Sequence, residues 1–291
     1  MLSVIIPVGR DEPLISKQIE EIKNTIGNVE YEIIIITIDK TVCKNIPEVR
    51  ICLYSPANCA EARNYGARMA KGDIFVFSDA HTEYKDRGWG ELIEDTFEQR
   101  EDIGVATLPR YTITGDIRNP KRYLNQIARG LKFNSDMNLL DVSYVTPLKD
   151  GEIPFIWGDF HVIRKEVFDD TGGYITEGWG HFEDRTMCVT CTLLGYKNIC
   201  IEGKQVGAYI RPAQTSHVSF PYWYYGNMCF QALHYTGERL ERAKRFWIED
   251  GHPEEVFDIV YNRWEHLRKY YLKRRVHDDN WYFETFLKKF R

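Results

Sequence analysis

The chain has 291 residues, a formal net charge of −5 and 43% hydrophobic residues. This length fits one large α/β domain with or without a helical appendage, and the apolar content suffices for a packed core. The mildly acidic charge argues against general nucleic-acid binding, which usually needs a basic face. Because no apolar run approaches the roughly 20 residues that span a bilayer and no signal peptide precedes the first strand, we expect a soluble, cytoplasmic protein.

The first third of the chain alternates apolar runs with amphipathic segments. Strands are predicted at 2–7, 32–38, 49–54, 73–78 and 104–111, and helices at 14–26, 61–71 and 88–100. Continuous apolar strands separated by helices are typical of a parallel sheet that is covered on both faces. The sequence therefore predicts an α/β fold with a mostly parallel sheet.

The remainder of the chain is less regular. Residues 112–153 read as a connecting excursion, followed by strands at 155–164 and 198–202 and helices at 165–170 and 183–195. Beyond 237, aromatic residues recur at near-helical spacing among charges of both signs. We therefore predict a main domain at 1–236 and a C-terminal helical extension at 237–291 packed on it. The basic cluster at 273–275 is interpreted as a solvated helix end.

The seven cysteines indicate free thiols and not a disulfide framework. They are odd in number and spread through strand-like and helix-like segments, which is typical of buried thiols in a reducing compartment. Cys188 and Cys191 form a lone C-x-x-C inside a helical pattern. Because no second pair stands at zinc-site spacing, we interpret both as core residues.

The strand at 73–78 stops at Asp79-Ala80-His81, a carboxylate and an imidazole two residues apart. In an extended strand end, positions i and i+2 point the same way, so the two side chains can converge on one point. Oxygen and imidazole ligands together suit a divalent cation such as Mn²⁺, with Mg²⁺ as the alternative. At the carboxyl end of a parallel strand, such a cation lies where α/β folds bind ligands. We interpret it as the metal that holds a nucleotide diphosphate.

Several segments resemble, in order, the motifs of the family 2 glycosyltransferases. V-I-I-P-V at 4–8 resembles their first strand, A-R-N-Y-G-A at 62–67 their A-R-N-x-G helix start, and Glu183-Asp184 with Leu194-Gly195-Tyr196 their E-D…G-Y helix. The resemblance covers about residues 2–220. It implies the GT-A fold, a mostly parallel sheet flanked by helices.

The same resemblance implies a nucleotide site at the strand ends. Its residues would be Pro7, Val8, Gly9, Asp39, Arg63, Ser78 and Asp79. Asp39 stands where such enzymes contact the uracil or ribose, and Arg63 would add a charge-assisted contact on the nucleotide side.

The Asp-x-His variant is most similar to the polypeptide N-acetylgalactosaminyltransferases. Those enzymes use a second, distant histidine as a ligand of Mn²⁺, which implies His217 as the third ligand here. The stretch 178–184 resembles their W-G-G-E-D sugar-binding motif and implies that Trp179 and Gly180 bind sugar. It carries one extra residue, because His181-Phe182 stands where a single glycine is expected. Trp157 and Gly158 are a second candidate pair for lining the sugar pocket, with core packing of either tryptophan as the alternative.

Two catalytic roles remain open for the adjacent acids. In an inverting enzyme, Asp184 would take the proton of the acceptor hydroxyl as general base. In a retaining enzyme, Glu183 and Asp184 would hold sugar hydroxyls, and a phosphate oxygen would take the proton. The Asp-x-His and Trp-Gly features favour retention slightly, and helix capping is the structural alternative. The aromatic run at 218–227 suggests either a lid over the site or core packing.

The sequence thus predicts a metal-dependent glycosyltransferase that moves a hexose or N-acetylhexosamine from a UDP-sugar to a hydroxyl acceptor, such as a glycan or a peptide. A nucleotidyltransferase would open with a glycine-rich basic loop, and Pro7-Val8-Gly9-Arg10 has one glycine. A non-catalytic sugar-nucleotide-binding subunit is the other alternative. The presence of Asp79, His81, Glu183 and Asp184 argues against a non-catalytic subunit.

Overall fold

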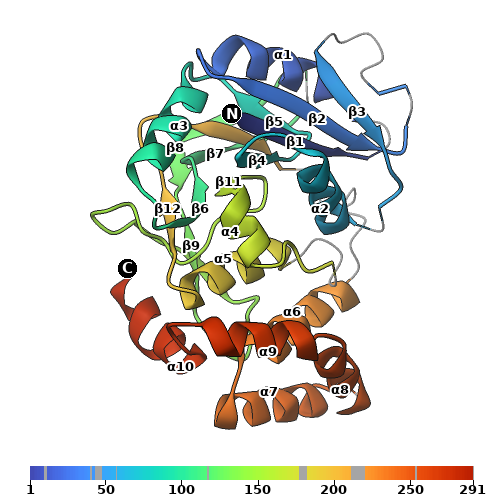
Figure 1. Ribbon diagram of the computed structural model, residues 1–291, viewed down its shortest axis with the longest axis vertical. Helices are drawn as coiled ribbons and strands as arrows, with labels where there is room; N and C mark the ends of the chain where they lie inside the picture. Colours follow the sequence, from blue (N-terminus) through green and yellow to red (C-terminus); the bar gives the residue numbers. More distant parts are fainter. Residues whose placement is uncertain are drawn as a thin grey trace.

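The computed structural model describes residues 1–9, 12–39, 41–42, 48–56, 58–116, 118–176, 182–210, 220–252 and 254–290. Within these residues, seven strands form the central sheet in the order β12-β6-β11-β4-β1-β2-β3 (Figure 1). They are β1 (Leu2–Val8), β2 (Tyr31–Thr37), β3 (Val49–Leu53), β4 (Ile74–Ser78), β6 (Ile103–Thr107), β11 (Phe160–Arg164) and β12 (Lys197–Cys200). All pairs are parallel except those of β11, which is antiparallel to both neighbours. The predicted mostly parallel sheet is confirmed.

Both faces of this sheet are buried, which explains the continuous apolar runs. Along β1, Ile5 packs into one core cluster, whereas Val4 and Ile6 pack into the other. Helices α1 (Ile15–Thr25) and α3 (Trp89–Gln99) cover the face of Val4, and α2 (Cys59–Met69), α4 (Lys165–Asp170) and α5 (Glu183–Leu193) cover the face of Ile5.

Helix α2 lies unusually close to the sheet. A Cβ atom on Gly66 would stand 2.3 Å from Cγ2 of Ile5, so this position requires glycine. The helix begins at Asn58, whose side chain accepts a hydrogen bond from the backbone N–H of Glu61. The glycine and the cap together fix where the residues of α2 meet the sheet edge.

The predicted strand at 104–111 is wrong, because the structure divides it between two sheets. Strand β6 ends at Thr107, and β7 (Arg110–Thr114) joins a second sheet with β5 (Thr82–Tyr84), β8 (Lys121–Ala128) and β13 (Val206–Tyr209) in the order β5-β13-β7-β8. Pro109 stands between the two strands and has no N–H to donate to a continuing ladder.

The excursion at 112–153 contains regular structure that the sequence did not reveal. It holds the end of β7, all of β8, and a hairpin of β9 (Leu131–Phe133) and β10 (Val142–Tyr144). The predicted strand at 155–164 is shorter, since only residues 160–164 pair in the sheet. The five residues before it lie at the sheet edge, where they become part of the candidate site.

The C-terminal part of the chain is helical, as predicted. It comprises α6 (Phe220–His234), α7 (Gly237–Glu249), α8 (Glu254–Arg263), α9 (Glu265–Arg274), α10 (Asp279–Trp281), a π-helical turn (Tyr282–Phe286) and a 3₁₀ turn (Leu287–Lys289). Figure 1 shows these helices gathered at the end of the molecule farthest from α1 and β3. No helix in the described ranges is long and apolar enough to cross a membrane. The domain boundary at 236 stays a prediction.

The aromatic run at 218–227 is largely the first half of α6, a helix that packs against α5, α7, α8 and α9. Tyr224 and Tyr225 are half-buried and pack against the main core cluster. Tyr224 also lies edge-on to Trp247. These two tyrosines therefore have the core-packing role and not that of a lid. Residues 218–219 lie outside the described residues.

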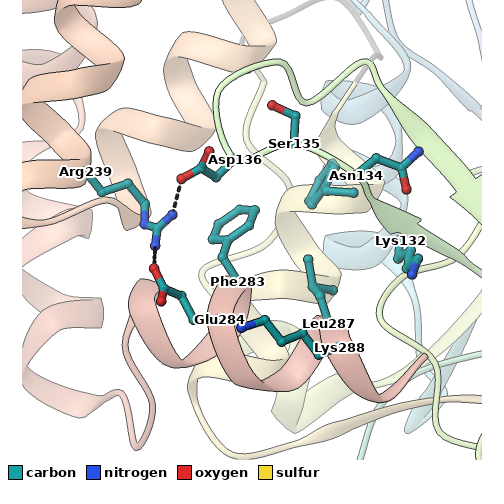
Figure 2. A pocket seen from close by; sticks show the side chains of 10 residues that line it. Lys132, Asn134, Ser135, Asp136, Arg239, Phe283, Glu284, Leu287 and Lys288 are labelled. Carbon is teal, nitrogen blue, oxygen red and sulfur yellow. Dashed lines mark hydrogen bonds and ion pairs between the residues drawn. The ribbon is translucent and has the colours of Figure 1, made fainter. Parts of the chain in front are cut away.

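A pocket of about 550 Å³ lies where the loop after β9 meets the C-terminal turns (Figure 2). Arg239 bridges Asp136 and Glu284 in its lining, and Lys132 donates to the backbone oxygen of Phe290. None of the predicted site residues lines it. The pocket therefore belongs to the joint between the two parts of the chain.

The cysteines in the described residues are free thiols. Cys188 and Cys191 are fully buried in α5, and burial raises the pKa of both thiols above the ordinary value. The interpretation of this C-x-x-C as core is confirmed.

Candidate functional site

The site forms at one edge of the central sheet. Because β11 is antiparallel to β4, its first residue, Phe160, pairs with the last residue of β4, Ser78. The residues just before β11 therefore meet the residues just after β4. The backbone N–H of Asp79 donates to the carbonyl of Asp159 over 2.8 Å and fastens the two segments together.

Asp79 and His81 converge at this edge, as predicted, but in a turn and not in an extended strand end, because the backbone N–H of Thr82 donates to the carbonyl of Asp79. Oδ2 of Asp79 lies 3.9 Å from Nε2 of His81, and both side chains are partly exposed. Ligands of one divalent cation stand roughly 2.0–2.6 Å from it, so two of them lie about 3–4 Å apart. The pair therefore fits one ion. Elsewhere among the described residues, no third histidine, cysteine or acid joins them. The predicted ligand His217 lies outside the described residues.

Arg63 is buried at the centre of the site. Its guanidinium lies 2.8 Å from Oδ1 of Asp79, 2.9 Å from Oε1 of Glu183 and 2.8 Å from the carbonyl of Gly158. One side chain thus connects the Asp-x-His motif, the Glu-Asp motif and the segment before β11. The charge of Arg63 orients Asp79, because it holds one carboxylate oxygen and leaves the other beside His81.

Glu183 and Asp184 point to different places. Glu183 is buried against Arg63, and its Oε2 has no hydrogen-bond partner within the described part of the chain. Burial and the neighbouring Asp184 raise the pKa of Glu183 to about 7, against the opposing pull of Arg63. Asp184 is half-buried, and its Oδ2 lies 3.0 Å from the position that a Cβ atom on Gly158 would take. The missing side chain at Gly158 lets the Asp184 carboxylate approach this edge.

The segment before β11 carries an aromatic ring and a buried ion pair. The Arg110 guanidinium lies 4.7 Å from the ring centre of Trp157, and its Nε is 2.9 Å from Oδ2 of Asp159. The exposed ring of Tyr144 lies 5.8 Å from that of Trp157 at an angle of 44°. Tyr144, Arg110 and Asp159 are not among the predicted site residues.

The ends of β1 and β2 lie at the same edge. Val8 pairs with Thr37 at the last position of the two strands, and Gly9 beyond it is exposed, with open space where a Cβ atom would stand. Asp39 closes a tight turn, because its Oδ1 accepts hydrogen bonds from the backbone N–H and the hydroxyl of Thr41. Pro7 is half-buried, whereas the Val8 side chain is part of the core.

Ser78 lies beneath this edge and not on it. Its side chain is fully buried, and its hydroxyl accepts hydrogen bonds from Nε2 of Gln18 and from the hydroxyl of Tyr84. Nε2 of Gln18 also donates to the carbonyl of Asp79 over 2.8 Å. Ser78 and Gln18 therefore support the backbone of the Asp-x-His motif from below. A polar residue in line with the apolar Ile15, Ile19 and Ile22 was the signal in the sequence for Gln18.

Trp179 and Gly180, the predicted sugar-binding pair, lie outside the described residues, as does the aromatic segment's start at 218–219. The described remainder of the predicted site, except Ser78, lies at the carboxyl ends of β1, β2 and β4, on α2, in the segment before β11 and at the first turn of α5.

The model of one protein family, Glycosyl transferase family 2, matches residues 3–172, which is more than half of the chain. The chain belongs to glycosyl transferase family 2. It is therefore a glycosyltransferase, and the resemblance stated from its motifs is confirmed at the level of the family. No curated protein matches it in sequence.

Solved structures of glycosyltransferases are similar in fold. GalNAc-T7 in complex with UDP, GalNAc and Mn²⁺ superposes with a TM-score of 0.70 at 15% identity, over 94% of this chain and 56% of that chain. The mannosyltransferase PcManGT from Pyrobaculum calidifontis, with GDP-Man and Mn²⁺, gives a TM-score of 0.50 at 16% identity, over 94% and 72%. S. aureus TarS 1–349 with UDP gives 0.52 at 13% identity, over 91% and 70%. This family 2 chain thus has the GT-A fold and spans little more than half the length of the GalNAc-T7 chain.

Proposed function

We propose that this family 2 glycosyltransferase moves a hexose or an N-acetylhexosamine from a UDP-sugar to a hydroxyl group of an acceptor, with a divalent cation in the donor site. The observation that carries the proposal is the split environment of Asp79. One of its oxygens is bound by Arg63, and the other faces His81. Folding alone does not need an imidazole beside a carboxylate that is already paired.

Asp79, His81 and His217 would hold the cation, Mn²⁺ by their mixed oxygen and nitrogen ligands, or Mg²⁺ as the alternative. When bound, the cation would neutralise the charge that grows on the departing diphosphate. The complexes of GalNAc-T7 and PcManGT, which contain Mn²⁺ beside UDP or GDP-Man, support this assignment.

The other residues of the edge would bind and orient the donor. Pro7, Val8 and Gly9 offer backbone at an open strand end, and Asp39 closes the neighbouring strand end, where a nucleotide would lie across the edge. Trp157, Gly158, Trp179 and Gly180 would line the sugar pocket. Arg63 would act through Asp79 and Glu183, because both of its terminal nitrogens are already bound to protein oxygens.

Asp184 is the acid that can reach an acceptor, since Glu183 is buried against Arg63. In the retaining mechanism, which the motifs favour slightly, Asp184 would hold a sugar hydroxyl while a donor phosphate oxygen takes the acceptor proton. In the inverting alternative, Asp184 itself would take that proton. The anomeric configuration of the product, read by NMR, separates the two.

Calorimetry of UDP binding tests the proposal. We expect at least ~10-fold tighter binding with Mn²⁺ than with EDTA, and loss of that difference in His81→Ala and in His217→Ala. His252→Ala, a partly exposed histidine in the C-terminal half, is the matched control and should bind as the unmodified protein does. Equal affinities with and without Mn²⁺ would contradict the proposal.

A donor-hydrolysis screen over UDP-, GDP- and TDP-sugars with Mn²⁺ then separates an enzyme from a binding subunit. The proposal expects release of sugar from a UDP-sugar. Tight UDP binding without hydrolysis or transfer would favour the non-catalytic alternative.

A further inference from the structure

Arg63 divides its hydrogen bonds between two carboxylates in a way that a guanidinium does not favour by itself. Its Nη1 donates to Oε1 of Glu183 over 2.9 Å, and its Nη2 donates to Oδ1 of Asp79 over 2.8 Å. A guanidinium and one carboxylate frequently form two parallel hydrogen bonds, which are strong and geometrically specific. Glu183 offers the second oxygen for such a pair, because its Oε2 is buried and has no partner within the described ranges. Another contact must therefore keep Arg63 from turning fully onto Glu183.

That contact is the ring of Tyr174, which is 4% exposed. The guanidinium carbon of Arg63 lies 5.7 Å from the centre of the ring. An aromatic face attracts a cation within about 6 Å of its centre, and more strongly where water is excluded. Nε of Arg63 is buried and has no hydrogen-bond partner in the part of the chain that the structure describes. Hydrogen bonds thus hold only the two terminal nitrogens, and the ring limits how the guanidinium can turn.

The backbone of Tyr174 is fastened to α2 beside Arg63. Nδ2 of Asn64 donates to the carbonyl of Tyr174, and the backbone N–H of Tyr174 donates to Oδ1 of Asn64, each over 2.8 Å. Gly173 has a φ of +79°, and a Cβ atom there would stand 2.9 Å from Oδ1 of Asn64. Glycine therefore permits this close approach. Because Asn64 follows Arg63 in the helix, Tyr174 has a fixed place relative to the guanidinium.

The hydroxyl end of Tyr174 is fastened to the central sheet. The hydroxyl is hydrogen-bonded to Nε2 of His161, a residue of β11 that is 1% exposed. Burial first, and then the charge of Arg63, lower the pKa of His161 well below its ordinary value, so the imidazole is neutral and does not repel Arg63. Phe77 and Phe168 lie edge-on to the tyrosine ring, with ring centres 5.2 Å and 5.5 Å away. The ring is therefore held at its backbone, at its edges and at its hydroxyl.

We propose that Tyr174 is a positioning residue, whose ring holds the guanidinium of Arg63 in the orientation that divides it between Asp79 and Glu183. This rests on the proposed function, because the division leaves Oδ2 of Asp79 beside His81 for the cation. Without the ring, Arg63 would gain a second hydrogen bond by turning onto Glu183, and Asp79 would lose the partner that orients it. Since Tyr174 is buried, it acts through Arg63 and not by contact with the donor.

Calorimetry of UDP binding tests this role by the ratio of the affinity with Mn²⁺ to the affinity with EDTA. Tyr174→Leu should lower the ratio about tenfold and leave the affinity in EDTA unchanged, because Asp79 loses its orientation. Tyr174→Phe should retain the ratio, since the ring remains. Tyr235→Leu is the matched control, because Tyr235 is also buried and its ring centre lies 5.9 Å from the guanidinium carbon of Arg239. This control should lower stability and leave the ratio of the folded protein unchanged.

A change that preserves the shape of the ring decides the case in which Tyr174→Leu does not fold. Pentafluorophenylalanine in place of Tyr174 has nearly the shape of phenylalanine, but fluorine withdraws the negative charge from the ring face that attracts a cation. The ratio should then be about tenfold lower than in Tyr174→Phe. Core packing alone would give the two proteins equal ratios.

The outcomes separate this proposal from the proposed function. An unchanged ratio in folded Tyr174→Leu, or equal ratios in Tyr174→Phe and the fluorinated protein, overturns the positioning role and leaves the proposed function standing. A lost ratio in Tyr174→Phe also overturns it, because the hydroxyl and not the ring would then be responsible. An equal fall in Tyr235→Leu does so too, since it would reflect a general loss of stability. Equal affinities with Mn²⁺ and with EDTA in the unmodified protein refute the proposed function itself.

Discussion

Two buried arginines, one in each part of the chain, are used in different ways. Arg268 on α9 donates to the carbonyls of Ala232, Leu233 and Tyr235 at the end of α6, where a helix leaves backbone oxygens without partners. Its partners are neutral, and the contacts complete a helix end. Arg63 instead pairs with two carboxylates, each of which keeps a second oxygen for other contacts.

A buried cation needs partners in both places, because an unpaired charge in the interior is costly. The two arginines differ in whether their partners keep an oxygen atom for a further contact. Arg268 leaves its partners saturated, whereas Arg63 leaves one oxygen of Asp79 beside His81 and one oxygen of Glu183 without a partner among the described residues. The second carboxylate oxygens of Asp79 and Glu183 are not needed to neutralise Arg63, and we take them as the mark of a functional site.

Replacing each arginine by methionine gives the largest expected effects. Arg63→Met leaves Glu183 and Asp79 without their cation and should lower the free energy of unfolding by roughly 3–5 kcal/mol, measured by urea titration. It should also abolish Mn²⁺-dependent UDP binding, because Asp79 loses its orientation. Arg268→Met should destabilise by a similar amount, yet its folded fraction should bind UDP normally. Normal UDP binding by folded Arg63→Met would remove the distinction between the two arginines.

Substituting one buried or half-buried acid in each part of the chain compares the two parts by their effect on sugar transfer. Asp184→Asn should reduce sugar transfer at least ~100-fold if Asp184 is the general base, with little change in stability. A mild loss would favour a sugar-holding role and the retaining mechanism. Asp279, buried among Arg239, Arg275 and Thr236 in the C-terminal part, is the matched acid. Asp279→Asn should lower stability and leave the transfer rate of the folded protein unchanged.

In the C-terminal part, His234 should make stability depend on pH. Burial first, and then Arg275 and Arg268, lower the pKa of His234 from an ordinary value of 6.5 to about 3. Between these values the unfolded chain binds a proton that the folded chain does not. The stability that His234 contributes is therefore complete above pH 6.5 and is lost as the pH drops towards 3, by about 2 kcal/mol at pH 5.

Urea titrations of the unmodified protein and of His234→Gln at pH 7 and pH 5 isolate this contribution, because the substitution should shift the difference in stability between the two pH values by about 2 kcal/mol in favour of pH 5. Glu183 has the opposite sign, because its raised pKa makes stability fall as the pH rises from 4.5 towards 7. If His234→Gln leaves the difference in unfolding free energy between pH 5 and pH 7 unchanged, another group causes the loss of stability at low pH.

The sequence was sufficient for most strands of the sheet and for its flanking helices, because apolar runs with clear ends fall in a region buried on both faces. It also predicted that Asp79 and His81 converge, although the structure brings them together through a turn after β4 and not in an extended strand end. Short strands were missed where the pattern is brief or interrupted, as at Pro109 and in β9 and β10.

The rest of the site depends on tertiary contacts that no local pattern encodes. Ser78 was predicted to touch the nucleotide, but Gln18 and Tyr84 enclose it from helices and strands elsewhere in the chain. Asp159 and Arg110 meet only because β11 is antiparallel to β4 and β7 belongs to another sheet. The antiparallel direction of β11 therefore brings Trp157, Gly158 and Asp159 to the end of β4.

The most direct test of the account is a crystal structure with Mn²⁺ and UDP, with anomalous scattering measured at the manganese edge. The account predicts one strong anomalous peak about 2.0–2.6 Å from both Oδ2 of Asp79 and Nε2 of His81, next to the diphosphate. A manganese peak elsewhere, or UDP bound at this edge with His81 turned away from Asp79, would contradict it.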